Sequence, residues 1–166
     1  MTIKPREFFM NHADLRVKKA FEVAEKAHAG QVDKADADYI FHPMTVASHC
    51  GENISAVIVA LLHDVAEDTG LTLDYLKKNI PLTDEELTAL TLLTHDKKIP
   101  YEDYIKTIKK NSLARTVKLC DLEHNLDFSR LCKDSEKLDE FIENLPEKDM
   151  QRIRKYTESK IELLSN

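Results

Sequence analysis

The 166-residue sequence has no tryptophan, only three glycines and no hydrophobic run long enough to cross a bilayer. Scarce glycine, with 42% hydrophobic and 33% charged residues, argues against a disordered or low-complexity chain and favours helices. Residues 1–6 also lack the apolar core of a signal peptide. We therefore expect a cytoplasmic protein that does not associate with a membrane.

Cysteines and basic residues are also few. The three cysteines, Cys50, Cys120 and Cys132, form no C-x-x-C pair, which argues against a disulfide framework or a thiolate zinc site. Lys and Arg total 24 against 30 Asp and Glu, which gives a formal net charge of −6. Because binding to a nucleic-acid polymer depends on cationic side chains that neutralise phosphates, we expect no such partner.

Helical patterns cover most of the chain, and no strand pattern competes with them. A chain of this length can bury one core, so the sequence predicts an all-α fold with a single domain over residues 1–166. The predicted helices occupy residues 13–29, 43–51, 54–68, 72–80, 83–93, 101–110, 112–131, 134–144 and 147–164. Asn53 and Ser112 are predicted N-caps, and Thr83 with Glu86 fits a capping box.

Two of these helices differ sharply in character. The helix predicted over residues 54–68 is apolar nearly all round, which indicates a central buried helix surrounded by others. The last helix alternates charged with apolar residues, and we interpret its charges, among them Arg152 and Lys155, as a solvated face. Residues 30–41 form the main irregular stretch.

Four side chains capable of metal binding or acid–base chemistry follow the apolar part of the central helix. They are His63, Asp64, Glu67 and Asp68. On a continuous helix, His63 and Glu67 would share one face, and so would Asp64 and Asp68. Burying an imidazole and carboxylates here requires a compensating cation, for which a divalent metal is suited.

Two further segments supply candidate ligands. His42 lies just before Pro43, and Asp121 lies far along the chain, in a predicted helix. With His63 and Asp64 they form a set of two imidazoles and two carboxylates, which suits one divalent ion. We favour Mn2+, with Fe2+ or Zn2+ as alternatives, and positions left open for water and a phosphate oxygen indicate a catalytic site.

Each candidate also has an ordinary structural interpretation. His42 taken alone is more often a partly buried histidine or a helix-start residue, and Asp121 could simply pair with Lys118 or Arg115. The isolated dipeptide His95-Asp96 is interpreted as a surface turn or a cap.

Four segments of the sequence, in this order, resemble a known family: residues 27–31, 39–47, 61–69 and 117–125. The chain is similar to the HD-domain metal-dependent phosphohydrolases. Among these it is most similar to the hydrolase domain of Rel/Spo alarmone enzymes and their small stand-alone relatives. The resemblance implies an HD-type helical bundle.

The resemblance also implies an activity. The enzyme would remove pyrophosphate from the 3′ position of guanosine tetra- or pentaphosphate, a small phosphorylated nucleotide, and would lack the synthetase reaction of the long enzymes. A metal held by His42, His63, Asp64 and Asp121 would activate the attacking water, which Glu67 and Asp68 orient or deprotonate. The expected substrate contacts are Gln31, Lys34, Lys118 and Asn125. No oligomeric state is predicted.

The chain departs from the family where substrate would be held. Asp33 stands where the family has a base-stacking arginine, and Leu122 replaces another arginine. An anion at position 33 removes a stacking surface and repels a polyphosphate. Two alternatives therefore stay open: an HD-type nucleotidase or other small-phosphate hydrolase, and a non-catalytic ligand sensor that retains the metal. Residues 94–98, with His95, and Arg115 could supply positive charge near the cleft, and Tyr101 or Tyr104 could offer an aromatic face for a base. Ordinary surface or packing roles are favoured for all of them.

Overall fold

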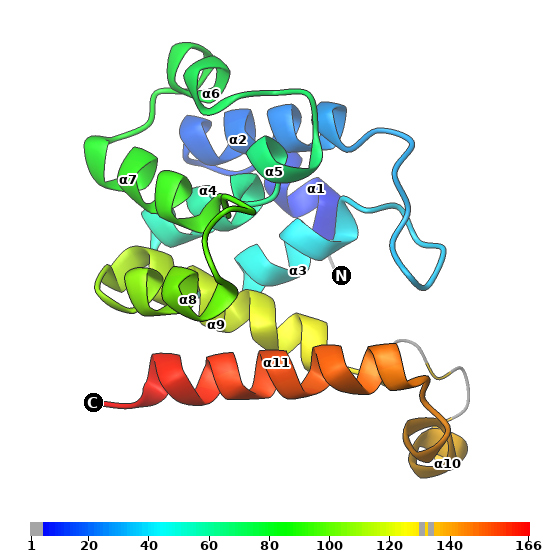
Figure 1. Ribbon diagram of the computed structural model, residues 1–166. Helices are drawn as coiled ribbons and strands as arrows, with labels where there is room; N and C mark the ends of the chain where they lie inside the picture. Colours follow the sequence, from blue (N-terminus) through cyan, green and yellow to red (C-terminus); the bar gives the residue numbers. More distant parts are fainter. Residues whose placement is uncertain (1–4, 130–131, 133–134) are drawn as a thin grey trace.

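The structure, a computed structural model, describes residues 5–129, 132 and 135–166 (Figure 1). Within these ranges the regular structure is helical apart from an isolated bridge between Val32 and Asp38, which confirms the all-α prediction. The elements are α1 (Pro5–Met10), α2 (Leu15–Ala27), α3 (Phe41–His49), α4 (Ile54–Leu62), α5 (Val65–Asp68), α6 (Leu73–Asn79), α7 (Asp84–Leu93), α8 (Tyr101–Lys109), α9 (Ser112–Leu126), the 3-10 turn η1 (Ser135–Lys137), α10 (Leu138–Glu143) and α11 (Glu147–Leu164). None of these described helices combines the length and the apolar character needed to cross a membrane.

Helix α4 forms the centre of the bundle. Every residue of α4 from Ala56 to Leu62 is buried, and α2, α3, α7 and α9 pack around it (Figure 1). Burial of such a continuous apolar surface is the main stabilising contribution to a fold of this kind. The predicted central helix is therefore confirmed over this stretch.

The continuous helix predicted over residues 54–68 is wrong at His63 and Asp64. The chain turns at these two residues and resumes as the short helix α5. In a regular helix, neighbouring side chains do not face each other. Here the Nε2 atom of His63 lies 3.2 Å from Oδ2 of Asp64, so the interruption allows both side chains to reach one point.

The predicted helix starts are mostly confirmed. The Asn53 side chain accepts a hydrogen bond from the backbone N–H of Ala56, and Thr83 and Glu86 form the predicted capping box. The prediction for Ser112 is wrong by one residue, because Asn111 is the N-cap of α9. Asparagine is as good a cap as serine, so the sequence offers two adjacent candidates.

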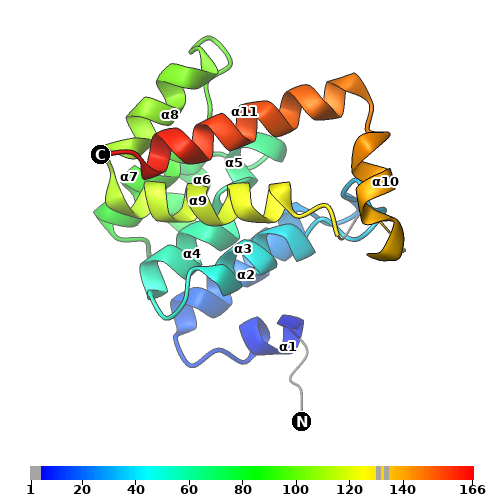
Figure 2. The ribbon, with the colours of Figure 1, turned by 90° about the horizontal axis from the view of Figure 1, so that it is seen from below.

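Helix α11 lies outside the group of helices that packs around α4. Helix α11 packs along α8 and α9, as Figures 1 and 2 show from two directions. Its bounds agree with those predicted, whereas α9 ends at Leu126, short of the predicted residue 131, and α1 was not predicted. Residues 130, 131 and 134 of the predicted helices lie outside the described residues.

Candidate metal centre and active site

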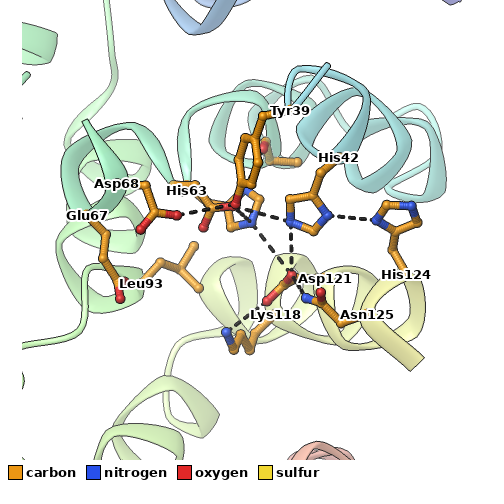
Figure 3. Close-up of polar contacts among 12 residues, drawn as sticks. Tyr39, His42, His63, Glu67, Asp68, Leu93, Lys118, Asp121, His124 and Asn125 are labelled. Carbon is orange, nitrogen blue, oxygen red and sulfur yellow. Dashed lines mark hydrogen bonds and ion pairs between the residues drawn. The ribbon is translucent and has the colours of Figure 1, made fainter. Parts of the chain in front are cut away.

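Four side chains from three segments converge beside α4, and Figure 3 labels three of them, His42, His63 and Asp121. The Nε2 atom of His42 lies 3.3 Å from Oδ2 of Asp64 and 3.3 Å from Oδ1 of Asp121. The Nε2 atom of His63 lies 3.2 Å from Asp64 Oδ2 and 3.8 Å from Asp121 Oδ1. His42, His63 and Asp64 offer ligand atoms within 4.8 Å of one another, a group that could hold a metal ion, and Asp121 approaches it from α9.

The state of the His63 ring fits a metal ligand. Its Nδ1 atom lies 2.7 Å from the carbonyl oxygen of Ala60, which only accepts, so Nδ1 carries the hydrogen of the neutral ring. The Nε2 atom is buried, has no hydrogen bond by strict geometry, and lies at ion-pair distance from Asp64 and Asp121. When a metal replaces the proton on this atom, its lone pair is available at the point where the two carboxylates approach. This mixed nitrogen and oxygen donor set suits a first-row divalent ion.

His124 supports the other histidine, and the sequence analysis missed it. Its Nδ1 atom lies 2.7 Å from Nδ1 of His42, and the two buried rings stack with centroids 4.9 Å apart. When His42 offers the lone pair of Nε2, its own Nδ1 is the donor and His124 the acceptor. The signal for this role was the spacing: His124 follows Asp121 by three residues on α9, which puts both on one face.

The cluster has strong internal electrostatics. Burial lowers the pKa of His42, but hydrogen bonds with Asp121 and Asp64 outweigh it and raise that pKa to about 9. The pKa of His63 is raised as well: burial opposes the shift, and the charge of Asp64 is the main cause of it. Burial favours the neutral forms of Asp64 and Asp121, yet neighbouring positive charges keep both pKa values below the ordinary range. In the metal-free site, ring protons thus supply the positive charge that an ion would bring.

Tyr39 connects the cluster to the acidic residues of α5, and the sequence analysis did not assign it a role. Its hydroxyl lies 2.8 Å from Oδ2 of Asp64. It also lies 3.2 Å from Oδ2 of Asp68, a contact that Figure 3 shows. Burial, and then the charge of Asp64, raise the pKa of Asp68. The Oε2 atom of the preceding residue, Glu67, accepts a hydrogen bond of 3.2 Å from the backbone N–H of His95.

The four expected substrate contacts lie in different settings. Lys118 Nζ lies 2.8 Å from Asp121 Oδ2, and the Asn125 amide donates to Oδ1 of the same carboxylate. Both residues line a pocket that opens onto the cluster, and so does Lys34. The Gln31 amide instead donates to the backbone carbonyl of Asp68 at 3.0 Å, at the end of α5.

The pocket has a volume of about 620 Å³, within the usual range for a small-molecule site. One side is formed by His42, Asp64 and Asp121 of the cluster, by Glu67 and Asp68, and by the loop of residues 32–34. The other side comes from α8 and α11, with Tyr101, Tyr104, Arg152, Lys155 and Tyr156. The charges of the last helix were expected to form only a solvated face, but Arg152 and Lys155 line this pocket.

The structure accounts for Asp33 and for the dipeptide at residues 95 and 96. Asp33 Oδ1 accepts hydrogen bonds from the backbone N–H groups of Ala35 at 2.8 Å and Ala37 at 3.1 Å, so its carboxylate organises the turn of the loop. Asp96 also forms a turn, because its carboxylate accepts from the N–H of Lys98 at 2.9 Å. His95, however, lines the pocket, which agrees with the alternative that places this segment near the cleft rather than with the favoured surface role.

Comparisons with known proteins agree with this geometry. No protein-family model matches the chain. Over 76 residues the chain is 41% identical to a probable GTP pyrophosphokinase of Mycobacterium leprae, a match that covers 44% of this chain and 10% of that protein. Over 123 residues it is 33% identical to a guanosine-3′,5′-bis(diphosphate) 3′-pyrophosphohydrolase of Borreliella burgdorferi, a match that covers 65% of this chain and 18% of that protein. The chain thus matches less than a fifth of the length of either relative.

A solved structure has the same fold. It is described as "A metazoan ortholog of SpoT hydrolyzes ppGpp and plays a role in starvation responses", and it matches with a TM-score of 0.71 and 18% identity over 93% of this chain and 89% of that one. Together with the sequence relatives, this match confirms the resemblance to the Rel/Spo-type hydrolase domain and the all-α, HD-type bundle.

Proposed function

We propose that the chain is a metal-dependent phosphohydrolase that removes pyrophosphate from the 3′ position of a guanosine polyphosphate. The observation that carries the proposal is the convergence of His42, His63, Asp64 and Asp121 on one point, next to two further carboxylates and a pocket of about 620 Å³. A purely structural metal site needs neither an adjoining pocket nor additional acids.

The proposed cofactor is one divalent ion, with Mn2+ favoured over Fe2+ and Zn2+, held by His42, His63, Asp64 and Asp121. When bound, such an ion supplies Lewis-acid stabilisation of developing charge on phosphoryl oxygens and lowers the pKa of water. The buried Nε2 atom of His63, which faces the carboxylates of Asp64 and Asp121, supports this assignment.

The acidic residues of α5 are the proposed proton acceptors. The raised pKa of Asp68 brings this carboxylate closer to the pKa of an efficient general base. The Tyr39 hydroxyl holds Asp68, and the backbone of His95 holds Glu67, so both carboxylates keep fixed positions at the rim of the pocket. Fixed geometry of this kind lowers the entropic cost of reaching the transition state.

The remaining assigned residues would bind and orient the substrate. Lys118 lies beside Asp121 and brings positive charge to the reacting end, where it would attract a phosphate group. Asn125 and Lys34 line the same cavity and would contact ribose or phosphate, whereas Gln31 would act through the end of α5. All of these positions lie within what we treat as one HD-type domain over residues 1–166.

The choice of hydrolysis over synthesis has support in the comparisons. The curated relatives carry names of both kinds, a GTP pyrophosphokinase and a 3′-pyrophosphohydrolase. The solved structure described as hydrolysing ppGpp matches over 89% of its length, whereas the curated relatives match over 10% and 18% of theirs. The region shared with this chain therefore corresponds best to a hydrolase unit.

A second candidate within the same chemistry is a hydrolase of another phosphorylated nucleotide. Asp33 favours it, because this residue occupies the position of the family's base-stacking arginine and its carboxylate is used in the turn of the loop. A site without that arginine has less reason to prefer guanine.

Product analysis over a panel of nucleotides tests the proposal and separates the two candidates. With Mn2+ present, we expect pyrophosphate from guanosine 3′,5′-bis(diphosphate) and little turnover of nucleoside monophosphates. If orthophosphate is released and no compound of the panel yields pyrophosphate, the pyrophosphohydrolase is excluded and the nucleotidase is favoured.

The variant Glu67→Gln tests the proposed proton acceptor, because it removes the carboxylate and keeps the size of the side chain. We expect it to lose activity by about a hundredfold or more while retaining the metal. No turnover of any compound by metal-loaded wild type would instead favour a ligand sensor.

A further inference from the structure

The side of the pocket made by α8 and α11 carries two cations, Arg152 and Lys155, that have no part in the proposed reaction. Lys118, Arg152 and Lys155 all line the pocket. The first two have acidic partners: Lys118 lies 2.8 Å from Asp121, and Arg152 lies 3.0 Å from Asp149. Lys155 has no ion pair within the described part of the chain. Its charge is therefore uncompensated on this side of the pocket.

Two aromatic rings hold Lys155 in place. Its Nζ atom lies 4.2 Å from the centroid of the Tyr101 ring and 5.4 Å from that of Tyr156, and both tyrosines line the pocket. Such contacts attract a cation and restrict its side chain, but they bring no negative charge. The ammonium group is thus positioned without being neutralised.

The surroundings of Lys155 favour an anion. Burial, followed by the like charges of Lys118 and Arg152, lowers the pKa of Lys155. A negative group bound at this point would offset the repulsion among Lys118, Arg152 and Lys155. An ammonium group forms strong, charge-assisted hydrogen bonds with phosphate oxygens.

We infer that Lys155, positioned by Tyr101, binds a phosphate group of the substrate that is not cleaved, so that the pocket takes a nucleotide phosphorylated at two separate positions. The inference rests on the proposed function, which assigns the reacting phosphate to the cluster of His42, His63, Asp64 and Asp121. Both ends lie in one cavity of about 620 Å³. In guanosine 3′,5′-bis(diphosphate) the group at Lys155 is the 5′-diphosphate.

A comparison of two substrates tests this directly. Lys155→Met should raise the KM for guanosine 3′,5′-bis(diphosphate) by about tenfold or more, with kcat changed by less than about twofold. It should leave the KM for guanosine 3′-diphosphate unchanged, since that compound lacks the 5′ group. Lys160 is the matched control, because it lies on the same helix, pairs with Glu123 at 3.0 Å and does not line the pocket. Lys160→Met should behave as wild type, and an equal rise of both KM values in Lys155→Met would overturn the inference.

The positioning role of Tyr101 has its own test. Tyr101→Phe keeps the ring under Lys155 and should keep the KM of wild type, whereas Tyr101→Leu should raise the KM as Lys155→Met does. Equal effects of the two substitutions at Tyr101 would contradict the role of the ring.

Binding of guanosine 5′-diphosphate to the metal-loaded protein separates the inference from the proposed function. Calorimetry should show binding to wild type and binding weakened by about tenfold or more in Lys155→Met. If wild type binds in this way but does not hydrolyse guanosine 3′,5′-bis(diphosphate), the proposed function fails and the phosphate subsite stands. Absent binding, or binding of equal affinity to both proteins, would overturn the subsite.

Discussion

The hydroxyl of Tyr39 is a single group that two carboxylates share. It lies between Asp64, a proposed metal ligand, and Asp68, a proposed base. Removal of this hydroxyl in Tyr39→Phe leaves the ring against His28, with which it makes a contact at 4.8 Å between centroids. We expect kcat to fall by about tenfold, because Asp68 loses the bond that orients it.

Steady-state kinetics and elemental analysis check this prediction together. The metal content of Tyr39→Phe should equal that of wild type. Tyr75→Phe is the control, since Tyr75 is exposed on α6 and outside the pocket, and its activity should not change. Unchanged kcat in Tyr39→Phe would remove Tyr39 from the mechanism.

His42 makes the stability of the metal-free protein depend on pH. Its pKa is about 9 in the folded protein against 6.5 for the ordinary group, so the folded state binds the proton more tightly. This contribution is fully present below pH 6.5 and is lost as the pH rises through about 9. Thermal unfolding in chelator should therefore give a Tm that falls from pH 6.5 to 9.

With saturating metal this slope should weaken or reverse, because the ion competes with protons for the same rings. In metal-free His42→Gln the fall over this pH range should be smaller than in wild type. A wild-type Tm that rises with pH in chelator would contradict the raised pKa.

The sequence predicts best those helices whose amphipathic pattern and end signals both lie within the helix or in the residues beside it. Helix α11 has its predicted bounds because Pro146 sets its start and its amphipathic pattern continues to Leu164. The break between α4 and α5 could not be predicted this way, because His63 faces Asp121 and Asp64 faces His42, residues that lie far away in the sequence. Local patterns carry no information about such a partner.

Glu86 joins three helices of the bundle, so the loss of one of its partners should lower the free energy of unfolding. The carboxylate is fully buried and binds Arg16 of α2 at 3.0 Å and Ser55 of α4 at 2.8 Å, while it caps α7. Arg16→Met leaves this charge without its cation, so the free energy of unfolding should fall by about 3 kcal/mol.

Lys19→Met is the control on the same helix. Its ion pair with Glu22 spans 3.9 Å between exposed side chains, so the loss should be below about 1 kcal/mol. Urea unfolding of the two variants measures the difference, and equal losses would mean that Arg16 does not compensate Glu86.

At the scale of the whole molecule, the two sides of the pocket differ in how far the sequence predicts them. The metal-capable residues stand out because His63 and Asp64 follow an apolar helix and the other segments match a family pattern. The side formed by Arg152 and Lys155 does not stand out, because charges on an amphipathic helix look alike whether they face solvent or a cavity. Only the packing of α11 on α8 and α9 decides which of them line the pocket.

Metal binding should stabilise the entire fold, because the proposed ligands come from α3, from the turn between α4 and α5, and from α9. At a free metal concentration of about 100 times the dissociation constant, the gain is about 2.7 kcal/mol. Thermal unfolding with and without Mn2+ measures it, and His63→Ala should lose the gain. An equal gain in that variant would place the ion elsewhere.

The most direct test is a titration of Mn2+ into metal-free protein while pyrophosphate release from guanosine 3′,5′-bis(diphosphate) is measured. The proposed site predicts no release without metal and a maximum at one ion per chain. Full activity in the absence of metal, or no pyrophosphate at any ratio of metal to protein, would contradict it.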